Sequence, residues 1–208
     1  MKLRYTWLIF AVVLLFFVDS KAGTHGGGIN VGVLISDPSG GDKDIYKVES
    51  LNSLSFGAFY RYTFSNIISL QTEILYANKG AKGKYYSSES KVHVWYLDFV
   101  PSLQCRILDT HSCFGCLYIG PICGLRVAAN FESDISGRAQ YYDITSSIKP
   151  SDYGYVIGAK LGLPRGSKEF GVDVRYSSGF VAPDDTGRNI DLKNRTVTVM
   201  LEMYFGKH

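Results

Sequence analysis

The chain has 208 residues, of which 46% are hydrophobic and 20% are charged. This length suits one domain, and the mean hydropathy of +0.01 is far too low for a bundle of membrane-spanning helices. The counts of 15 tyrosines, 12 phenylalanines and 22 glycines are high. Aromatic residues favour β-strands, and glycines favour tight turns and crowded barrel interiors.

The first 22 residues are predicted to be a secretory signal peptide. Lys2 and Arg4 precede an apolar run over residues 7–18, and Ser20 and Ala22 are the small residues that a signal peptidase reads. The run is shorter than the ~20 residues of a membrane-spanning helix, which favours a signal over an anchor. Cleavage before Gly23 leaves 19 basic and 18 acidic residues, a net charge of +1. This charge gives no electrostatic reason to expect a nucleic-acid partner.

Residues 23–208 are predicted to form one domain with eight strands. The segment from Leu54 to Phe64 alternates apolar residues with small, polar or charged ones. Because successive side chains of a strand point to opposite faces, one face of such a segment is an apolar stripe. The predicted strands are 26–36, 53–64, 67–78, 92–107, 114–129, 153–163, 169–180 and 195–205.

The links between these strands alternate strictly in length. Three are tight hairpin turns, at residues 65–66, 109–113 and 164–168. The other four, at residues 37–52, 79–91, 130–152 and 181–194, are long and rich in Asp, Ser, Lys and Gly. Outer-membrane β-barrels have short periplasmic turns and long extracellular loops. The links therefore predict an antiparallel up-and-down transmembrane barrel with both termini in the periplasm.

The charges of the predicted strands all fall on the face opposite the apolar stripe. In a closed barrel this face lines the lumen, where an unpaired charge would be strongly destabilising. Five cations and four anions are expected to pair there as an ion network that fills the lumen. They are Arg61, Glu73, Asp98, Arg106, Arg126, Lys160, Asp173, Arg175 and Glu202.

Aromatic residues lie near both ends of the predicted strands. The short-turn end has Tyr62, Phe64, Phe170 and Phe205, and the long-loop end has Phe56, Tyr76, Trp95, Tyr153 and Phe180. They are expected to form the two interfacial girdles of a barrel in outer-membrane lipid. A soluble lipocalin-like barrel would show the same alternation turned inside out. The glycines beside arginines on the polar faces, the balanced mid-strand charges and the aromatics favour the membrane barrel.

Two prolines interrupt the pattern. Pro101 and Pro121 lie inside predicted strands and lack a backbone N–H for the ladder. If the hairpin that joins their strands is centred near His111, the two prolines lie opposite each other, at a local bulge.

The residues resemble the PorT-like outer membrane β-barrel family of Bacteroidetes-type bacteria, over nearly all of the mature chain. The motifs are 76–81 (Tyr-Ala-Asn-Lys-Gly-Ala), 96–101 (Tyr-Leu-Asp-Phe-Val-Pro), 118–121 (Tyr-Ile-Gly-Pro), Arg175-Tyr176 and 194–205. The resemblance implies a barrel class rather than a particular activity. It also implies a partner, the barrel insertion machinery, which reads a terminal aromatic residue. Here Phe205 is followed by Gly206, Lys207 and His208, which departs from that pattern.

Few residues suggest chemistry. In an exported protein Cys113 or Cys116 could bridge to Cys105 across the hairpin turn, and Cys123 falls on the apolar face. A single CxxC pair with His111 does not complete a zinc site, so no metal or other cofactor is expected. The histidines, His93 among them, have no serine at an esterase-like spacing.

The sequence thus predicts a small, non-catalytic outer-membrane barrel with a plugged lumen. Its role would be structural, or an interaction with a protein partner through the long extracellular loops. Two alternatives stay open: a secreted, soluble, ligand-binding barrel of the lipocalin type, and a barrel enzyme that modifies lipid.

Overall fold

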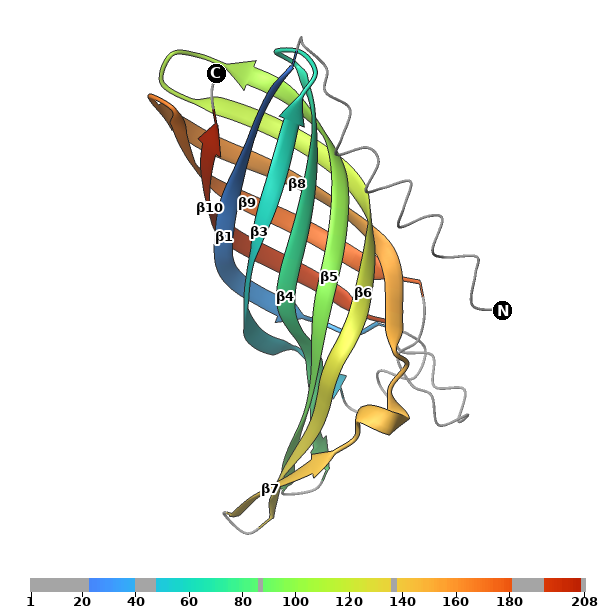
Figure 1. Cartoon of the computed structure of the whole chain (residues 1–208). Helices are drawn as coiled ribbons and strands as arrows, with labels where there is room; N and C mark the ends of the chain where they lie inside the picture. Colours follow the sequence, from blue (N-terminus) through green and yellow to red (C-terminus); the bar gives the residue numbers. More distant parts are fainter. Residues whose placement is uncertain (1–22, 40–47, 86–87, 136–137, 181–192, 207–208) are drawn as a thin grey trace, which may run out of the picture.

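The computed structural model describes residues 23–39, 48–85, 88–135, 138–180 and 193–206 (Figure 1). The predicted signal peptide at residues 1–22 lies outside this part of the chain. None of the described residues belongs to a helix long and apolar enough to cross a membrane. The elements are β1 (Thr24–Ser36), β2 (Val48–Glu49), β3 (Leu51–Thr63), β4 (Ile68–Tyr85), β5 (Ser88–Asp109), β6 (Phe114–Ile135), β7 (Arg138–Asp143), the 3₁₀ turn η1 (Thr145–Ser147), β8 (Ser151–Arg165), β9 (Lys168–Gly179) and β10 (Arg195–Gly206).

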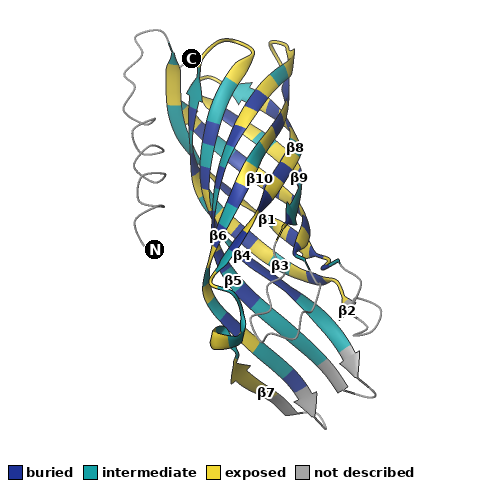
Figure 2. Ribbon diagram, turned by 90° about the vertical axis from the view of Figure 1, so that its right-hand side faces the viewer, coloured by how far each residue is buried: buried dark blue, intermediate teal, exposed yellow. Residues whose placement is uncertain are grey.

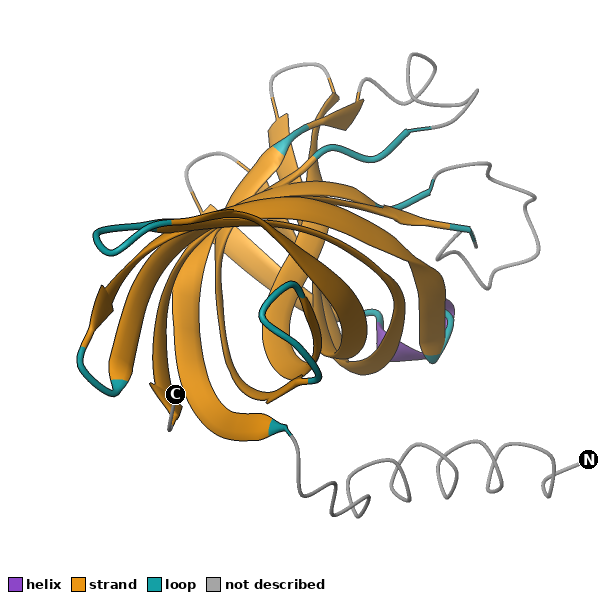
Figure 3. Ribbon diagram, turned by 90° about the horizontal axis from the view of Figure 1, so that it is seen from above, coloured by secondary structure: helices purple, strands orange, loops and turns teal. Residues whose placement is uncertain are grey.

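Eight of these ten described strands close into an antiparallel barrel. β1 pairs with β3 on one side and with β10 on the other, and β4 pairs with β5, so the ring has no gap. The remaining two strands, β2 and β7, lie outside the ring as partners of β4 and β6. Figure 3 shows the strands as a ring seen from above. The predicted eight-stranded, all-β barrel is confirmed.

The apolar stripes face outward. Leu54, Ile119 and Leu201 are 66%, 58% and 62% exposed, whereas Glu73 and Asp173 on the opposite face are fully buried. The alternation of exposed and buried residues is visible along the strands of the barrel wall in Figure 2. A soluble lipocalin-like barrel needs the reverse arrangement, so the outward stripes rule out that alternative. Because the strands pair with one another around the closed ring, the backbone of the wall is hydrogen-bonded between strands and can face hydrocarbon.

Outward aromatic residues pack together at both ends of the wall. At the long-loop end, Tyr76 lies between Phe56 and Trp95, with ring centroids 5.4 and 5.0 Å apart. At the short-turn end, the Tyr62 and Phe64 rings meet edge to face at 4.8 Å. Of the other predicted girdle residues, Tyr153, Phe170, Phe180 and Phe205 are also exposed.

Large inward aromatic rings rest on glycines of the neighbouring strand. Tyr118 is in register with Gly158, and Phe114 with Gly162. A Cβ atom on either glycine would lie 2.4 Å from the ring of its partner, so no other residue leaves the ring room. This packing accounts for two of the glycines on the polar faces of the sequence, Gly158 and Gly162.

The three short turns are found where the link lengths predict them. β3 and β4 are joined by residues 64–67, β5 and β6 by residues 110–113, and β8 and β9 by Gly166 and Ser167. Gly166 has a φ of 62°, which a residue with a side chain rarely adopts. Both described ends of the chain lie at this end of the barrel (Figure 1).

Two of the four predicted long links are mostly strand. β4 runs on to Tyr85 and β5 begins at Ser88, so the link predicted at residues 79–91 is a hairpin. The link predicted at 130–152 contains the end of β6, then β7 and η1. The predicted boundaries are wrong here because the apolar alternation stops where the strands leave the ring, while their backbone pairing continues. Of the other two links, residues 40–47 and 181–192 lie outside the described chain.

The extended strands form a projecting sheet beyond the barrel. β3 pairs with β4 only as far as Ala77, and β8 pairs with β6 only as far as Leu125. Beyond these points β4, β5 and β6 continue together, flanked by β2 and β7 (Figure 1). We call this part the projecting sheet: residues 78–85, 88–95 and 127–135, with β2 and β7.

The segment after β7 folds back over the projecting sheet. Ile144 and Ile148 pack against a buried cluster of Val94, Tyr96 and Ala129. Two hydrogen bonds secure the turn, because the Thr145 N–H donates to Asp143 Oδ1 (2.8 Å) and Thr145 Oγ1 accepts from the Ala129 N–H (3.0 Å). Hydrogen bonds from Thr145 also hold the pKa of the Asp143 carboxyl below its ordinary value. Asp143 therefore stays ionised as the acceptor of this turn.

Pro101 and Pro121 lie opposite each other, as the hairpin centre predicts. Phe99 pairs with Cys123 and Leu103 with Ile119 in one unbroken register, which places the prolines across from one another. The expected bulge is absent at this point, because the register shifts fall at Trp95/Tyr96 and at Arg106/Leu108. The prolines interrupt the ladder hydrogen bonds without shifting the strands.

Candidate functional site: the charged interior

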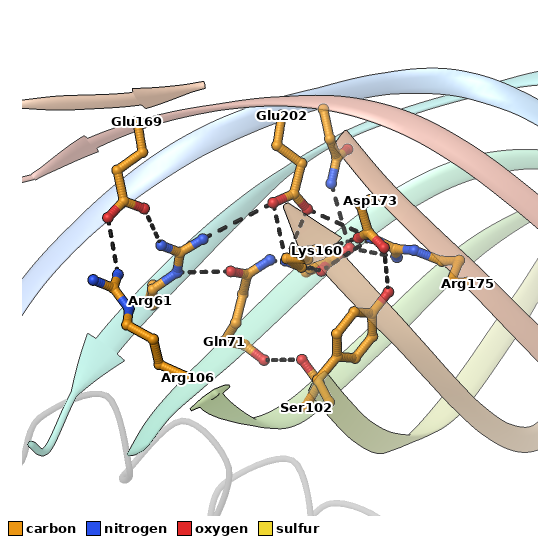
Figure 4. A network of polar contacts seen from close by, with 12 residues as sticks. Arg61, Gln71, Ser102, Arg106, Lys160, Glu169, Asp173, Arg175 and Glu202 are labelled. Atoms are coloured by element: carbon orange, nitrogen blue, oxygen red, sulfur yellow. Dashed lines mark hydrogen bonds and ion pairs between the residues drawn. The ribbon is translucent and has the colours of Figure 1, made fainter. Parts of the chain in front are cut away.

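Most of the predicted lumen charges lie together inside the barrel. Seven of the nine are no more than 7% exposed although they are ionisable: Arg61, Glu73, Asp98, Lys160, Asp173, Arg175 and Glu202. They come from β3, β4, β5, β8, β9 and β10, whose inward positions converge on the barrel axis. Figure 4 shows how side chains from these strands point toward one another.

Five of these residues form a central cluster: Glu73, Lys160, Asp173, Arg175 and Glu202. Lys160 Nζ donates to both oxygens of Glu202, at 2.9 and 3.0 Å (Figure 4). Arg175 donates from Nη1 to Glu73 Oε2 at 2.8 Å and also pairs with Asp173. The central cluster thus has two cations that share three carboxylates.

Neutral side chains complete the hydrogen bonds of the central cluster. The Tyr118 hydroxyl donates to Asp173 Oδ1 at 2.7 Å, and Gln71 Nε2 donates to Glu73 Oε1 at 2.7 Å. Asn30 Nδ2 donates to Glu73 Oε2 at 3.3 Å. Charges buried in this way are tolerated because the remaining lone pairs are also satisfied.

A second cluster, the turn-end cluster, consists of Arg61, Arg106 and Glu169. Glu169 accepts from Arg61 Nη1 at 2.5 Å and from Arg106 Nη2 at 3.1 Å (Figure 4). Arg61 also reaches the central cluster, since its Nε donates to Gln71 Oε1 at 2.9 Å and its Nη2 lies 3.9 Å from Glu202 Oε2. Together the two clusters contain four cations and four carboxylates, so their formal charges balance.

A third cluster, the outer cluster, lies toward the projecting sheet and consists of Lys79, Asp98 and Asp152. Lys79 Nζ is 2.9 Å from Asp98 Oδ1 and 3.6 Å from Asp152 Oδ2. Asn194 Nδ2 donates to the same Asp152 oxygen at 2.9 Å. The other oxygen of Asp152 is buried and accepts no hydrogen bond from the described residues.

The prediction that Arg126 belongs to the ion network is wrong. No carboxylate of the described residues lies within ion-pair distance of its guanidinium, and its Nε and Nη1 atoms are buried without a hydrogen-bond partner. Arg126 pairs with Tyr96 next to a register shift in β6. The two aspartates of the outer cluster are paired with Lys79. Spacing along the strand predicted the face of Arg126 but not its depth in the barrel.

Several charged members of the clusters were not predicted. Glu169 precedes the outward Phe170 at the start of a predicted strand, so the alternation itself could have placed it inside. Lys79 and Asp152 lie within predicted long links, beyond the apolar alternation of the predicted strands. Of the predicted residues, Arg106 is at the rim, since its side chain is 25% exposed and contacts the exposed Asp109 as well as Glu169.

An apolar layer separates the central cluster from the outer cluster. It consists of buried side chains that point inward: Leu75, Val100, Tyr118, Ile122, Val156 and Met200. A cavity of about 20 Å³ lies within this layer, lined by Arg175 on one side and by Lys79 and Asp98 on the other. Such a volume holds about one water molecule. Arg175 Nε is buried and has no hydrogen-bond partner among the described residues.

Three carboxylates in the central cluster are close enough to suggest a cation site. Oxygen atoms of Glu73, Asp173 and Glu202 lie within 4.8 Å of one another. Lys160 Nζ, however, is 3.9, 3.8 and 2.9 Å from oxygens of these three residues. The ammonium group therefore occupies the place that a metal ion would need, and the arrangement neutralises charge rather than coordinating a metal.

The cysteines and His93 do not add a reactive centre to the interior. All four cysteines are free thiols in this structure, so the disulfide that Cys105 could form with Cys113 or Cys116 is not made. Cys105 is exposed on the outer face whereas Cys116 is buried inside, so the wall separates these two. His93 lies on the outer face, with Nδ1 2.9 Å from Asn78 Nδ2 and Nε2 3.6 Å from Glu132 Oε2.

Comparisons with known proteins agree with this architecture. The crystal structure of Neisserial surface protein A is 13% identical in sequence with a TM-score of 0.50, and the match covers 87% of this chain and 96% of that one. The outer membrane protein OprG from Pseudomonas aeruginosa is 12% identical with a TM-score of 0.50, over 89% of this chain and 95% of that one. At such identities the likeness concerns the fold alone. A search of curated proteins found none that matches.

A family model described as an outer membrane protein beta-barrel domain matches residues 20–181. This match covers most of the chain and includes the strands that supply the central cluster, except β10. It agrees with the outward apolar faces, which place the protein in the lipid of the outer membrane. The chain belongs to the outer membrane protein beta-barrel domain family.

Proposed function

We propose that this protein is a non-catalytic outer-membrane barrel that is closed to ions, and that it acts through its extracellular part. One observation carries the proposal: the charge-balanced pairing of four cations with four carboxylates across the lumen, from the turn-end cluster to the central cluster. Eight strands enclose an interior that side chains can fill. A filled interior leaves the outside of the molecule to carry the function.

The energetic argument favours a plug over a conduction path. A buried ion that loses its partner is strongly destabilising, so ions that pass through would have to break pairs such as Lys160–Glu202 and Arg175–Glu73. The apolar layer around Met200 and Val156 adds a stretch in which ions find few polar groups. The cavity of about 20 Å³ is too small for a hydrated ion.

Planar lipid bilayers test this closure directly. The folded wild-type protein is expected to give no steady current, while an open porin in the same bilayer serves as the positive control. Insertion is checked by the gel mobility of unboiled against boiled protein. A steady current through correctly folded wild-type protein would contradict the plug.

The surroundings of the barrel follow from the same proposal. The outward aromatic clusters at Phe56–Tyr76–Trp95 and Tyr62–Phe64 would lie at the two membrane interfaces. Phe205, the last aromatic of β10, is the residue that the barrel insertion machinery would read. The narrower resemblance to PorT-like barrels stays a prediction from short motifs and adds no activity to this proposal.

The absence of catalysis is also part of the proposal. It is supported by the chemistry of the most concentrated polar site, in which Lys160 and Arg175 neutralise the carboxylates that could act as bases or ligands. A role as a lipid-modifying enzyme would require a reactive group at the membrane surface. Incubation of the folded protein with outer-membrane lipids and analysis by mass spectrometry is expected to leave the lipids unchanged.

A further inference from the structure

The strand β7 forms one edge of the projecting sheet. All six of its residues pair with β6, and within the described part of the chain no strand pairs with its other edge. Figures 1 and 2 show β7 at the far tip of the projecting sheet, away from the barrel wall. The opposite edge strand, β2, has only two residues.

The backbone groups that face this free edge can be identified. The Ile144 N–H donates to the Ala129 carbonyl at 3.0 Å, which continues the β6–β7 ladder by one position. Hydrogen-bonded residues alternate along an antiparallel strand, so Tyr142 and Gln140 also turn their N–H and C=O groups toward β6. The groups of Ala139, Tyr141 and Asp143 then point away from the sheet, giving three donors and three acceptors along one line.

Natural edge strands are usually protected by shortness, by charged residues or proline, or by a bulge. β7 has the sequence Arg-Ala-Gln-Tyr-Tyr-Asp, in which the two charged residues stand at the ends and proline is absent, and its register with β6 is unbroken. Tyr141 and Tyr142 are 69% and 51% exposed. Because successive side chains point to opposite faces, each face of the sheet ends in an exposed tyrosine. The edge therefore offers both backbone pairing and aromatic neighbours to an added strand.

We propose that the free edge of β7 binds an extended peptide segment of a partner protein outside the cell, which adds to the projecting sheet as a further strand. The proposal rests on the proposed function, since it names the kind of partner that the extracellular part would take. Backbone hydrogen bonds would supply the affinity, and the side chains beside Tyr141 and Tyr142 the selectivity. Aromatic and β-branched residues of the peptide are the ones that pair well with tyrosine across strands.

The geometry of the sheet argues for a different protein rather than a second copy in the same membrane. Two antiparallel edge strands of identical chains are related by a two-fold axis perpendicular to the sheet. The projecting sheet continues beyond one end of the barrel in the barrel's long direction (Figure 1). The plane of the sheet is therefore steep to the membrane, and an axis perpendicular to the sheet lies near the membrane plane. Copies in one membrane share their orientation and are related by axes along the membrane normal. Symmetric antiparallel β7 pairing within one membrane is thus excluded.

Amide hydrogen exchange on the full-length protein in detergent micelles tests whether the edge is free. The N–H groups of Ala139, Tyr141 and Asp143 are expected to exchange rapidly, and those of Gln140 and Tyr142 slowly. Slow exchange at Tyr141 in the protein alone would overturn the proposal, because it would mean that the edge is already paired. Hydrogen exchange is independent of conductance. The proposed closure to ions can therefore fail while the free edge is confirmed, and the free edge can fail while the closure is confirmed.

Peptide selection tests whether the edge accepts a strand. A phage-displayed library of random peptides is panned on the folded wild-type protein, and the recovered peptides are measured on two variants. Tyr141→Pro removes a free-edge N–H while leaving the β6 ladder intact, because proline is tolerated where the N–H faces solvent. Tyr141→Val, the matched control, keeps the backbone donor in a residue that suits a strand.

The selected peptides are expected to bind Tyr141→Pro roughly tenfold more weakly than Tyr141→Val, or worse, because both variants lack the tyrosine ring and only the valine variant keeps the backbone donor. Gel mobility of unboiled protein confirms that both variants remain folded. Equal binding to the proline and valine variants would overturn edge pairing. Recovery of no peptide that binds the wild type would overturn it as well.

Discussion

Arg175 and Arg126 are two arginines on the inward side of the wall that differ in their surroundings. Arg175 contacts Glu73 and Asp173, whereas no carboxylate of the described chain pairs with Arg126. The guanidinium of Arg175 therefore offsets charges that are otherwise buried in the lumen. The guanidinium of Arg126 has two buried N–H groups whose desolvation is not repaid by hydrogen bonds.

This difference predicts opposite outcomes for the same substitution. Arg175→Met leaves buried carboxylates unpaired and is expected to lower the free energy of unfolding by about 3–5 kcal/mol. Arg126→Met removes unsatisfied donors and is expected to change it by less than about 1 kcal/mol. Urea unfolding in lipid vesicles, followed by gel mobility, measures both. A loss for Arg126→Met as large as that for Arg175→Met would show that Arg126 has a partner.

Arg175 and Arg126 also show which features of the interior could be predicted from the sequence: the face of a charged residue could, and its partner could not. The face of Glu73, Lys160 and the other central residues could be predicted because period-two alternation determines which side of the wall a side chain occupies. Which charges meet depends on depth along the barrel axis and therefore on strand register, which one sequence does not show. Lys79 and Asp152 could not be predicted, because they lie where the alternation had ended.

At the scale of the strand, the position of a residue on the outward or the inward face determines whether a charge is tolerated there. Leu201 lies in the middle of β10, in register with Val31 and Val172, and is 62% exposed. All three side chains lie on the lipid face. The same strand turns Met200 and Glu202 inward, so neighbouring positions meet entirely different surroundings.

A charge at Leu201 is therefore expected to be costly. Leu201→Arg should lower the free energy of unfolding in a bilayer by about 2–4 kcal/mol, because the guanidinium would face hydrocarbon near the midplane. Gln140→Arg on the exposed face of β7 is the control and should have little effect. Unchanged stability of Leu201→Arg in vesicles would mean that this face of β10 meets water.

Strand ends were the least predictable part of the elements. Apolar alternation requires lipid on one side, so it stops at the membrane surface, near Tyr76 and Trp95. Backbone pairing has no such requirement, and β4 and β5 continue to Tyr85 and Ser88 as a hairpin. A pattern in hydrophobicity thus measures the lipid-embedded length of a strand rather than its full length. The register shift near Trp95 has no signature in the sequence either.

At the scale of the whole molecule, the two ends of the barrel are different. Short turns, such as the one at Gly166 and Ser167, close one end, and the projecting sheet extends from the other. The outward aromatic residues lie near both ends of the wall, and the turn-end and central clusters lie inside between them. The outer cluster lies toward the projecting sheet, to which Lys79 belongs. If the proposed function is correct, the end with the short turns faces the periplasm and the projecting sheet lies outside the cell.

Cysteine labelling on intact cells tests this orientation. In a background in which the four native cysteines are replaced by serine, Tyr141→Cys is expected to react with a membrane-impermeant maleimide on whole cells, because its side chain lies at the exposed tip of the projecting sheet. Ser167→Cys, in the turn between β8 and β9, should react only after the outer membrane is permeabilised. The contrast between the two variants follows from the strict alternation of short turns and long connections around the ring. Labelling of Ser167→Cys on intact cells, with Tyr141→Cys protected, would mean that the barrel is inserted the other way round and that β7 could meet only periplasmic partners.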